Sequence, residues 1–285
     1  MRKAFLICLV MVALAASPLW AAPAKTEPVL KTPFTELVAF GDSFSDDGFA
    51  DGHGFKRYTN TLTWVEYLAR MLDLPLYNLA WGGAMSDDRN YANGPDERWS
   101  GLLWQVDEYL KELPKGADIS KILFTIKCGS NDAWSDIPGG EVSAKNVREA
   151  MTRLAKAGAK YILYRETSAV LMAPGYLEGK YADYHDPWRK LVDDMNVATK
   201  KELAEFGKEF PNVKVIYQDT DTLFTKIKNG EEGYKFEILD KQWWGTYTYP
   251  HIDKYMWYDE WHPMGQVHKL MADETVEALK ASGIK

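Results

Sequence analysis

Cysteine is scarce in this chain, and its scarcity argues against a small scaffold held together by disulfides. The 285 residues contain two cysteines, Cys8 and Cys128. Cys8 lies in an N-terminal apolar segment that we expect to be removed, which would leave Cys128 without an intrachain partner. A chain of this length buries a core large enough to be stable without disulfides. Because no histidine pairs with it in the local sequence, Cys128 is interpreted as a small buried side chain rather than a nucleophile.

Basic clusters and long apolar runs are also missing. The formal net charge is −7 and no basic run stands out, so a nucleic acid is not expected as a partner. Beyond the N-terminus, no segment is apolar enough to cross a bilayer.

The N-terminal segment has the layout of a secretory signal peptide. A basic start precedes an apolar run over residues 4–16, and alanines follow up to Ala24. A run this short favours a cleaved signal over the alternative, a single membrane anchor. We therefore predict a signal peptide and cleavage region over residues 1–24 and a single domain over residues 25–285. The mature protein would be periplasmic or secreted.

Short apolar runs alternate with amphipathic segments along the rest of the chain. Strands are predicted where apolar runs end in turn residues, and helices where apolar residues recur every three or four positions. This alternation predicts an α/β domain whose mostly parallel sheet has helices on both faces. The expected strands are residues 37–40, 76–80, 121–127, 159–164 and 213–217. The expected helices are residues 62–72, 102–113, 142–157, 186–206 with Asp186 as N-cap, 219–227, and a final helix with Pro263 in its first turn, ending near Ala281.

A serine, a histidine and a carboxylate form the candidate catalytic set. Ser43 lies just past the end of the first predicted strand, at the edge where open α/β sheets bind ligands. Asp259 stands three residues before His262, a spacing that brings two side chains together on one side of a helical turn. Acyl transfer needs a serine nucleophile, a histidine that takes its proton, and an acid that orients the histidine. Because G-x-S-x-G is absent, the frame differs from that of the α/β-hydrolases.

Two further polar blocks follow apolar runs, and the four blocks together resemble a known family. The blocks are Gly41-Asp42-Ser43, Asn78-Leu79-Ala80-Trp81-Gly82-Gly83-Ala84, Gly129-Ser130-Asn131-Asp132, and Asp259-x-x-His262-Pro263. In this order they resemble the blocks of the GDSL, or SGNH, family of esterases and lipases. The resemblance extends from about Glu36 to the C-terminal helix. It implies the SGNH-hydrolase fold, a three-layer α/β/α sandwich with a flavodoxin-like sheet of about five strands.

The resemblance also implies a role for each block. Ser43 would be the nucleophile, His262 the general base and then acid, and Asp259 the residue that orients His262. The family's oxyanion hole, carried over position by position, consists of the Ser43 N–H, the Gly83 N–H and the Asn131 amide, with Gly82 as the alternative to Gly83. Phe49 stands where the family often has asparagine, so the first loop departs from the family pattern.

No metal or other cofactor is expected. His251 and Asp253 are spaced as two metal ligands can be, but no third ligand stands at a matching spacing.

The residues from Trp243 to Trp261 are rich in aromatic side chains, most of which we expect in the core or in an edge strand. Trp261 precedes His262 and is expected to contact the substrate, as is Trp81 in the second block. An aromatic wall can hold an acyl chain, stack on a sugar or face a quaternary ammonium group. We therefore predict an exported serine ester hydrolase that acts on small or lipid-like esters.

Other interpretations stay open at the level of the sequence. A phospholipase, an acyltransferase, a sugar-acetate esterase or a choline esterase would use the same residues. A non-catalytic protein that binds carbohydrates or lipids is the alternative of another class. The intact set of Ser43, Asn131, Asp259 and His262 argues against it, because a binding protein does not need that combination. Transient contact with a membrane surface is compatible with the sequence. The sequence does not indicate an oligomeric state.

Overall fold

The computed structural model describes residues 29–49, 57–94, 96–134, 139–167, 172–177, 183, 185–231, 235–246 and 249–284. The predicted signal peptide and cleavage region, residues 1–24, lies outside the described residues. Within them, no helix has both the length and the apolar composition that a membrane span requires.

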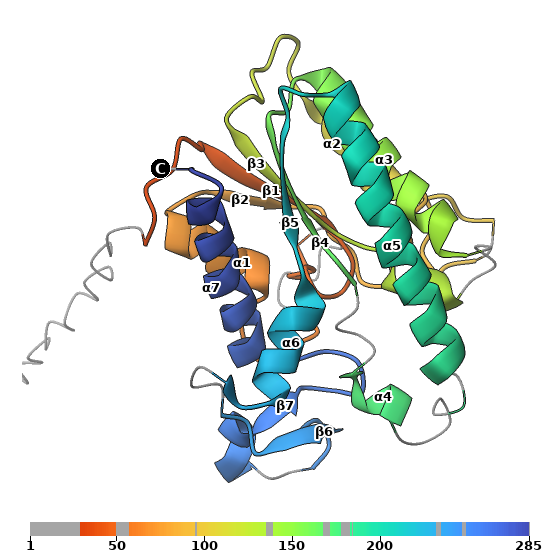
Figure 1. Ribbon diagram of the computed structural model, residues 1–285, viewed down its shortest axis with the longest axis vertical. Helices are drawn as coiled ribbons and strands as arrows, with labels where there is room; N and C mark the ends of the chain where they lie inside the picture. The colour runs from red at the N-terminus through yellow and green to blue at the C-terminus, as the bar shows by residue number, and fades with distance from the viewer. Residues whose placement is uncertain are drawn as a thin grey trace, which may run out of the picture.

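A five-stranded parallel sheet forms the centre of the molecule (Figure 1). Its strands are β1 (Glu36–Gly41), β2 (Leu76–Asn78), β3 (Ile122–Lys127), β4 (Tyr161–Arg165) and β5 (Lys214–Gln218). Their spatial order is β2-β1-β3-β4-β5, and every neighbouring pair is parallel. This order confirms the predicted flavodoxin-like sheet. The chain changes direction across the sheet between β1 and β3, and ligands bind at the carboxyl ends of strands at such a switch point.

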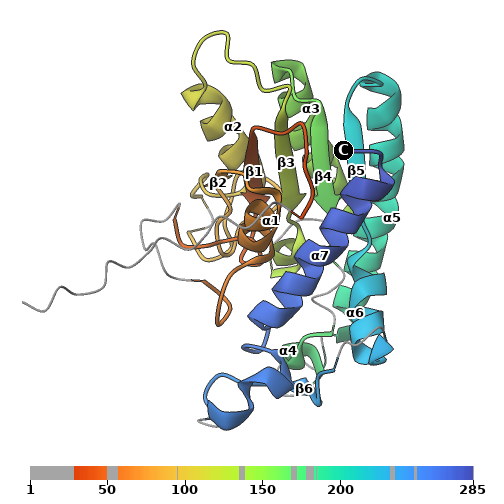
Figure 2. The ribbon, with the colours of Figure 1, turned by 90° about the vertical axis from the view of Figure 1, so that its left-hand side faces the viewer.

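Helices cover both faces of the sheet, as the alternating pattern predicts (Figures 1 and 2). On one face, α1 (Trp64–Leu72) and α7 (Gly265–Ala281) pack against each other beside α6 (Thr220–Lys228). The other face is covered by α2 (Leu102–Glu112), α3 (Gly140–Ala157) and α5 (His185–Glu209).

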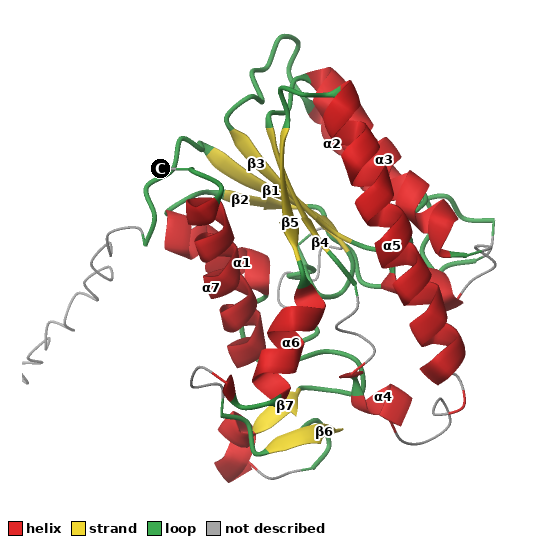
Figure 3. Cartoon of the chain, viewed as in Figure 1, coloured by secondary structure: helices red, strands yellow, loops and turns green. Residues whose placement is uncertain are grey.

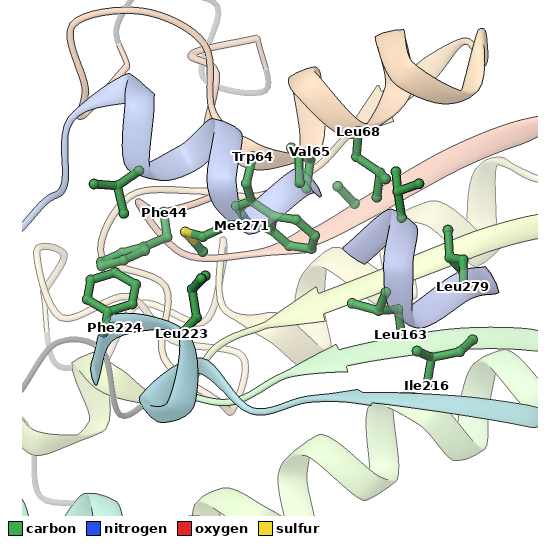
Figure 4. Close-up of a cluster of buried hydrophobic side chains, with 14 of the residues drawn as sticks. Phe44, Trp64, Val65, Leu68, Leu163, Ile216, Leu223, Phe224, Met271 and Leu279 are labelled. Carbon is green, nitrogen blue, oxygen red and sulfur yellow. The ribbon is translucent and has the colours of Figure 1, made fainter. Parts of the chain in front are cut away.

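Alternate residues of each strand supply two hydrophobic cores, one on each face. Leu37 and Ala39 of β1 belong to the core under α1 and α7, whereas Val38 and Phe40 belong to the core under α2, α3 and α5. Figure 4 shows the first core, where Trp64 and other side chains of α1 lie near those of α7 and of the strands. Strands that are buried on both faces read as continuous apolar runs, which explains why they could be recognised in the sequence.

Two predicted helix starts depend on a named residue, and both differ from the observed starts. α5 begins at His185, so Asp186 lies inside its first turn rather than at its N-cap, and the helix continues to Glu209. α7 begins at Gly265, with Met264 in the extended conformation of an N-cap. Pro263 lies before this helix and forms an isolated β-bridge with Trp257.

The structure also contains short elements that the sequence pattern does not predict. β6 (Ile238–Gln242) and β7 (Tyr255–Trp257) form a parallel two-stranded sheet apart from the main one (Figure 3), and the 3-10 helix η5 (Tyr249–Lys254) lies between them in sequence. Two more elements, η1 (Ser130–Trp134) and α4 (Pro174–Leu177), follow β3 and β4. Elements this short contain too few turns for a hydrophobic period to be visible.

Candidate active site

The chain turns sharply where β1 ends, and this turn presents Ser43. Gly41 lies so close to β3 that a Cβ atom there would be 2.3 Å from the carbonyl oxygen of Lys127. The N–H groups of Ser45 and Asp46 donate to the Asp42 carbonyl oxygen at 2.9 and 3.1 Å. Ser43 is therefore held in a tight turn at the carboxyl edge of the sheet.

Ser43, His262 and Asp259 form a continuous chain of hydrogen bonds. His262 Nε2 lies 2.7 Å from Ser43 Oγ, and His262 Nδ1 lies 2.8 Å from each carboxylate oxygen of Asp259. Tyr58 packs beside the imidazole, with 4.8 Å between the ring centroids. Because Ser43 and His262 are 219 positions apart in sequence, only the fold brings them together.

Asp259 and His262 lie in an irregular turn rather than in the helical turn that their spacing suggests. One oxygen of Asp259 accepts the backbone N–H groups of Trp261 at 2.8 Å and of His262 at 2.7 Å. The Tyr258 N–H donates to the His262 carbonyl oxygen at 2.8 Å. The carboxylate closes this turn itself, so the expected side-chain contact forms on a different backbone.

The surroundings of Asp259 favour its charged form. Burial raises the pKa of Asp259, but hydrogen bonds from the His262 ring and from the backbone N–H groups of Trp261 and His262 outweigh burial and bring the pKa below its usual value. An ionised carboxylate keeps the His262 proton on Nδ1 and leaves Nε2 as an acceptor toward Ser43.

The N–H groups that were predicted to bind an oxyanion lie along the same cavity as His262. Asn131 Nδ2 donates one hydrogen to the Ala84 carbonyl oxygen at 2.9 Å, which fixes the plane of an amide that carries a second hydrogen. Gly82 N–H donates to the Asp46 carboxylate at 2.6 Å and is thereby occupied. By contrast, the N–H groups of Ser43 and Gly83 have no acceptor within the described residues. This difference favours Gly83 over Gly82 as the donor to a ligand.

Gly83 has a φ of 82°, which a side chain rarely adopts, and a Cβ atom there would lie 2.3 Å from Asn90 Oδ1. The second block therefore needs glycine at this position for conformational and for steric reasons.

A cavity of about 100 Å³ lies over Ser43 and His262, and its walls are largely aromatic. The aromatic side chains that line it are Phe44, Tyr58, Tyr91, Trp134, Tyr176 and Trp261. Trp261 thus lies where its position before His262 suggests.

Trp81 is not among the residues that line this cavity. Its ring packs edge-on against Trp99 and Trp104, with centroids 5.3 and 6.5 Å away, on the side of the sheet that α2 covers. The prediction that Trp81 contacts substrate is therefore not supported by its position. The glycines that follow Trp81 line the cavity, while the tryptophan itself contributes to packing.

Trp261 is held in place by α4 and by η1. The Tyr176 and Trp134 rings lie edge-on to it, with centroids at 4.9 and 5.5 Å. A Cβ atom at Gly175 would be 2.4 Å from the Trp261 ring, and the Gly175 N–H donates to the Glu260 carbonyl oxygen at 2.9 Å. α4 therefore packs directly on the loop that carries Asp259 and His262.

Several side chains of the site carry no local signal in the sequence. Tyr58, Tyr91, Trp134 and Tyr176 each come from a different loop or short helix, and nothing in their surroundings distinguishes them from core aromatics. The buried Lys127, behind the Ser43 turn, was likewise not predicted.

No group of three or more potential metal ligands occurs in the part of the chain that the structure describes. The side chain of His251 is outside that part, so the pairing of His251 with Asp253 stays untested. Cys128 is buried and unpaired with another cysteine, and burial raises the pKa of its thiol, so it stays protonated as a packing residue.

The chain is similar to several known proteins. A family model described as GDSL-like Lipase/Acylhydrolase matches residues 37–275. Thermolabile hemolysin of Vibrio parahaemolyticus serotype O3:K6 (strain RIMD 2210633) is 26% identical over 292 residues, which cover 91% of this chain and 66% of the hemolysin. The chain thus spans slightly less than two thirds of that relative's length. The GDSL esterase/lipase At1g71691 of Arabidopsis thaliana is 24% identical over 306 residues, covering 83% of this chain and 80% of that protein.

Among solved structures, a member of the lipolytic protein G-D-S-L family from Veillonella parvula DSM 2008 has a similar fold. Its TM-score is 0.50 at 18% sequence identity, and the similarity covers 85% of this chain and 97% of that chain. At this identity the similarity concerns the fold alone.

Proposed function

The chain belongs to the GDSL-like lipase/acylhydrolase family, and we propose that it hydrolyses ester bonds through an acyl-enzyme formed on Ser43. The observation that carries this proposal is the unbroken hydrogen-bonded chain from the Ser43 hydroxyl through His262 to Asp259. A serine hydroxyl is a weak nucleophile unless an adjacent base takes its proton.

The first half of the reaction transfers the acyl group to Ser43. His262 Nε2, 2.7 Å away, takes the hydroxyl proton as Oγ attacks the ester carbonyl carbon. The carbonyl oxygen becomes an oxyanion, and the N–H groups of Ser43 and Gly83 and the Asn131 amide donate to it. When this intermediate collapses, the bond to the alcohol breaks and the alcohol leaves with the proton from His262.

The second half regenerates the enzyme. A water molecule attacks the acyl carbon and gives a proton to His262, and the same three donors bind the second oxyanion. Collapse breaks the bond to Oγ, which regains the proton, and the carboxylic acid leaves. Asp259 stays charged throughout, because its hydrogen bonds lower its pKa, and it stabilises the imidazolium that forms in each half.

The substrate is proposed to be a small or lipid-like ester. Support comes from the aromatic walls of the cavity and from the position of Trp261 beside His262. An acyltransferase would use an alcohol in place of water at the second step, and a phospholipase or a sugar-acetate or choline esterase would differ in the alcohol that leaves. Export is proposed from the sequence of residues 1–24 alone.

The decisive test is Ser43→Ala with p-nitrophenyl acetate as substrate. We expect hydrolysis by the wild type, almost none by the variant, and a fluorophosphonate adduct on Ser43 that the variant cannot form. Ser45→Ala is the matched control: it removes a hydroxyl two residues away that accepts from Trp64 Nε1 at 3.1 Å and has no hydrogen bond to His262. Unchanged turnover in Ser43→Ala would refute the assignment.

A further inference from the structure

A lysine is buried directly behind the Ser43 turn. Lys127 ends β3 with a side chain that is 1% exposed, and it faces Asp42, whose side chain is 0% exposed. Lys127 Nζ lies 2.9 and 3.1 Å from the two oxygens of the Asp42 carboxylate and 4.0 Å from the centre of the Phe44 ring. Moving both charges out of water is costly, so such a pair is weak evidence of a contribution to stability. Its position suggests another role.

Asp42 braces the turn that presents Ser43. Its Oδ1 accepts the Phe44 N–H at 3.1 Å, across the residue that carries the candidate nucleophile. The backbone adds a second connection, because Gly41 and Lys127 are partners in the pairing of β1 with β3, and the Asp42 N–H donates to the Lys127 carbonyl oxygen at 3.1 Å. Lys127 thus holds the end of β1 with its side chain and with its backbone.

The same ion pair reaches the third block. Ser130 Oγ donates to Asp42 Oδ2 at 2.9 Å and accepts from Lys127 Nζ at 3.2 Å. Ser130 immediately precedes Asn131 in η1. A closed triangle of Lys127, Asp42 and Ser130 therefore connects the Ser43 turn to the backbone that carries the Asn131 amide.

We propose that Lys127 is a positioning residue for ester hydrolysis, whose buried ammonium group fixes the distance between the Ser43 turn and Asn131 so that their N–H groups can bind one oxyanion. This inference rests on the proposed roles of Ser43 and Asn131. Lys127 is not among the residues that line the cavity, so it acts through Asp42 and Ser130 rather than on the substrate. A misplacement of about 1 Å in such an arrangement can lower a rate about 10²-fold.

Lys127→Met tests the proposal, because methionine keeps an unbranched side chain and removes the charge. We expect kcat for p-nitrophenyl acetate to fall about 10²-fold while KM changes little, since the donors bind the transition state rather than the ground state. Lys121→Met is the matched control, because Lys121 is an exposed lysine immediately before the same strand. It should leave kcat and KM unchanged. Circular dichroism and the thermal midpoint report whether each variant is folded.

Ser130→Ala is a second variant that keeps the ion pair and removes the hydroxyl that links it to η1. Because Ser130 also lines the cavity, the kcat of this variant is compared with that of Lys127→Met, which does not change a lining residue. Ser130→Ala should also have a lower kcat and a nearly unchanged KM. It tests the positioning role if Lys127→Met does not fold. Each variant is then combined with Asn131→Ala. If Lys127 acts through the position of Asn131, the loss in kcat for the double variant is smaller than the product of the two single losses.

Two results would overturn the proposal. One is a folded Lys127→Met or Ser130→Ala variant with a lower thermal midpoint but an unchanged kcat, which indicates a structural role only. The other is a double variant whose loss equals the product of the single losses. Hydrolysis by the wild type and its absence in Ser43→Ala test the proposed function separately, so a failure of this inference is distinguishable from a failure of that function.

Discussion

Asp259→Asn should remove most of the turnover while it preserves the turn around His262. In the wild type one Asp259 oxygen accepts the N–H groups of Trp261 and His262 at 2.8 and 2.7 Å, and an asparagine Oδ1 can accept both. The NH₂ group would then occupy the place of the second oxygen, 2.8 Å from His262 Nδ1. Oδ1 lies at the same distance from Nδ1, but it already accepts the two backbone N–H groups, so the NH₂ group decides the hydrogen bond to the ring. It donates where a carboxylate accepts.

This reversed hydrogen bond moves the His262 proton from Nδ1 to Nε2. Nε2 would then donate to Ser43 Oγ, 2.7 Å away, and could no longer take the serine proton. The same exchange in a serine protease lowers kcat about 10⁴-fold, and we expect a loss of that order here. Asp259→Ala also removes the acceptor of two backbone N–H groups, so it should in addition lower the free energy of unfolding by about 1–3 kcal/mol.

The assay is kcat for p-nitrophenyl acetate, with thermal unfolding measured on the same preparations. Asp259→Asn should have a thermal midpoint near that of the wild type and the large loss in kcat. Asp259→Ala should have both a lower thermal midpoint and a large loss in kcat. Asp253→Asn is the matched control, an exposed carboxylate in η5 for which neutralisation should change neither quantity. A kcat for Asp259→Asn within about tenfold of the wild type would refute the tautomer argument.

Three other changes test the surroundings of the site. Burial raises the pKa of Asp132 to about 6, so the folded protein holds this proton more tightly than the unfolded chain and loses stability as the pH rises from about 4 to about 6. An asparagine at this position has no such proton, so between about pH 4 and about pH 6 the free energy of unfolding of Asp132→Asn should rise by up to about 3 kcal/mol relative to that of the wild type. Urea titrations at several pH values measure this difference, and a difference that is constant with pH would contradict the prediction. Gly175→Ala places a Cβ atom 2.4 Å from Trp261, so the free energy of unfolding should fall by about 1–3 kcal/mol and KM should rise; an unchanged midpoint would show that the indole moves away freely. Trp261→Ala should impair a preferred larger ester more than p-nitrophenyl acetate, and equal losses on both would remove Trp261 from substrate selection.

The central strands of the main sheet, β1, β3 and β4, could be predicted because they are buried on both faces. Leu37, Val38, Ala39 and Phe40 are all fully buried, two on each side, so the sequence shows an unbroken apolar run that ends at Gly41. Parallel strands that alternate with helices then share one carboxyl edge, and the polar blocks after β1, β2 and β3 meet there. β6 escaped prediction because it has no buried residue and contains two charged ones, so it shows no apolar run. β7 lies within the aromatic segment that is expected in the core or in an edge strand.

Spacing alone could not identify the conformation that joins Asp259 to His262. Residues three apart meet on a helical turn, and they also meet when a carboxylate accepts the backbone N–H groups that follow it, as Asp259 does. The contact was therefore predictable, but its backbone was not. For Trp81 the place was predictable but the contact was not. It lies in a block that reaches the site, but its ring packs on Trp99 and Trp104. A block fixes where its glycines approach a ligand and does not fix the direction of its largest side chain.

The buried ion pair of Lys127 and Asp42 could not be predicted from either residue alone. A lysine at the end of an apolar strand is ordinarily interpreted as the point where the strand reaches solvent, because an unpaired ammonium is too costly to bury. Asp42 alone is equally unremarkable, because aspartate is common in turns. The informative feature is the pair. In the register of β1 with β3, Gly41 stands beside Lys127, so Asp42, the residue after β1, brings a carboxylate to the buried ammonium. Opposite charges that close two adjacent parallel strands at the same level therefore indicate a buried pair, and this pair can be sought wherever the ends of neighbouring strands are known.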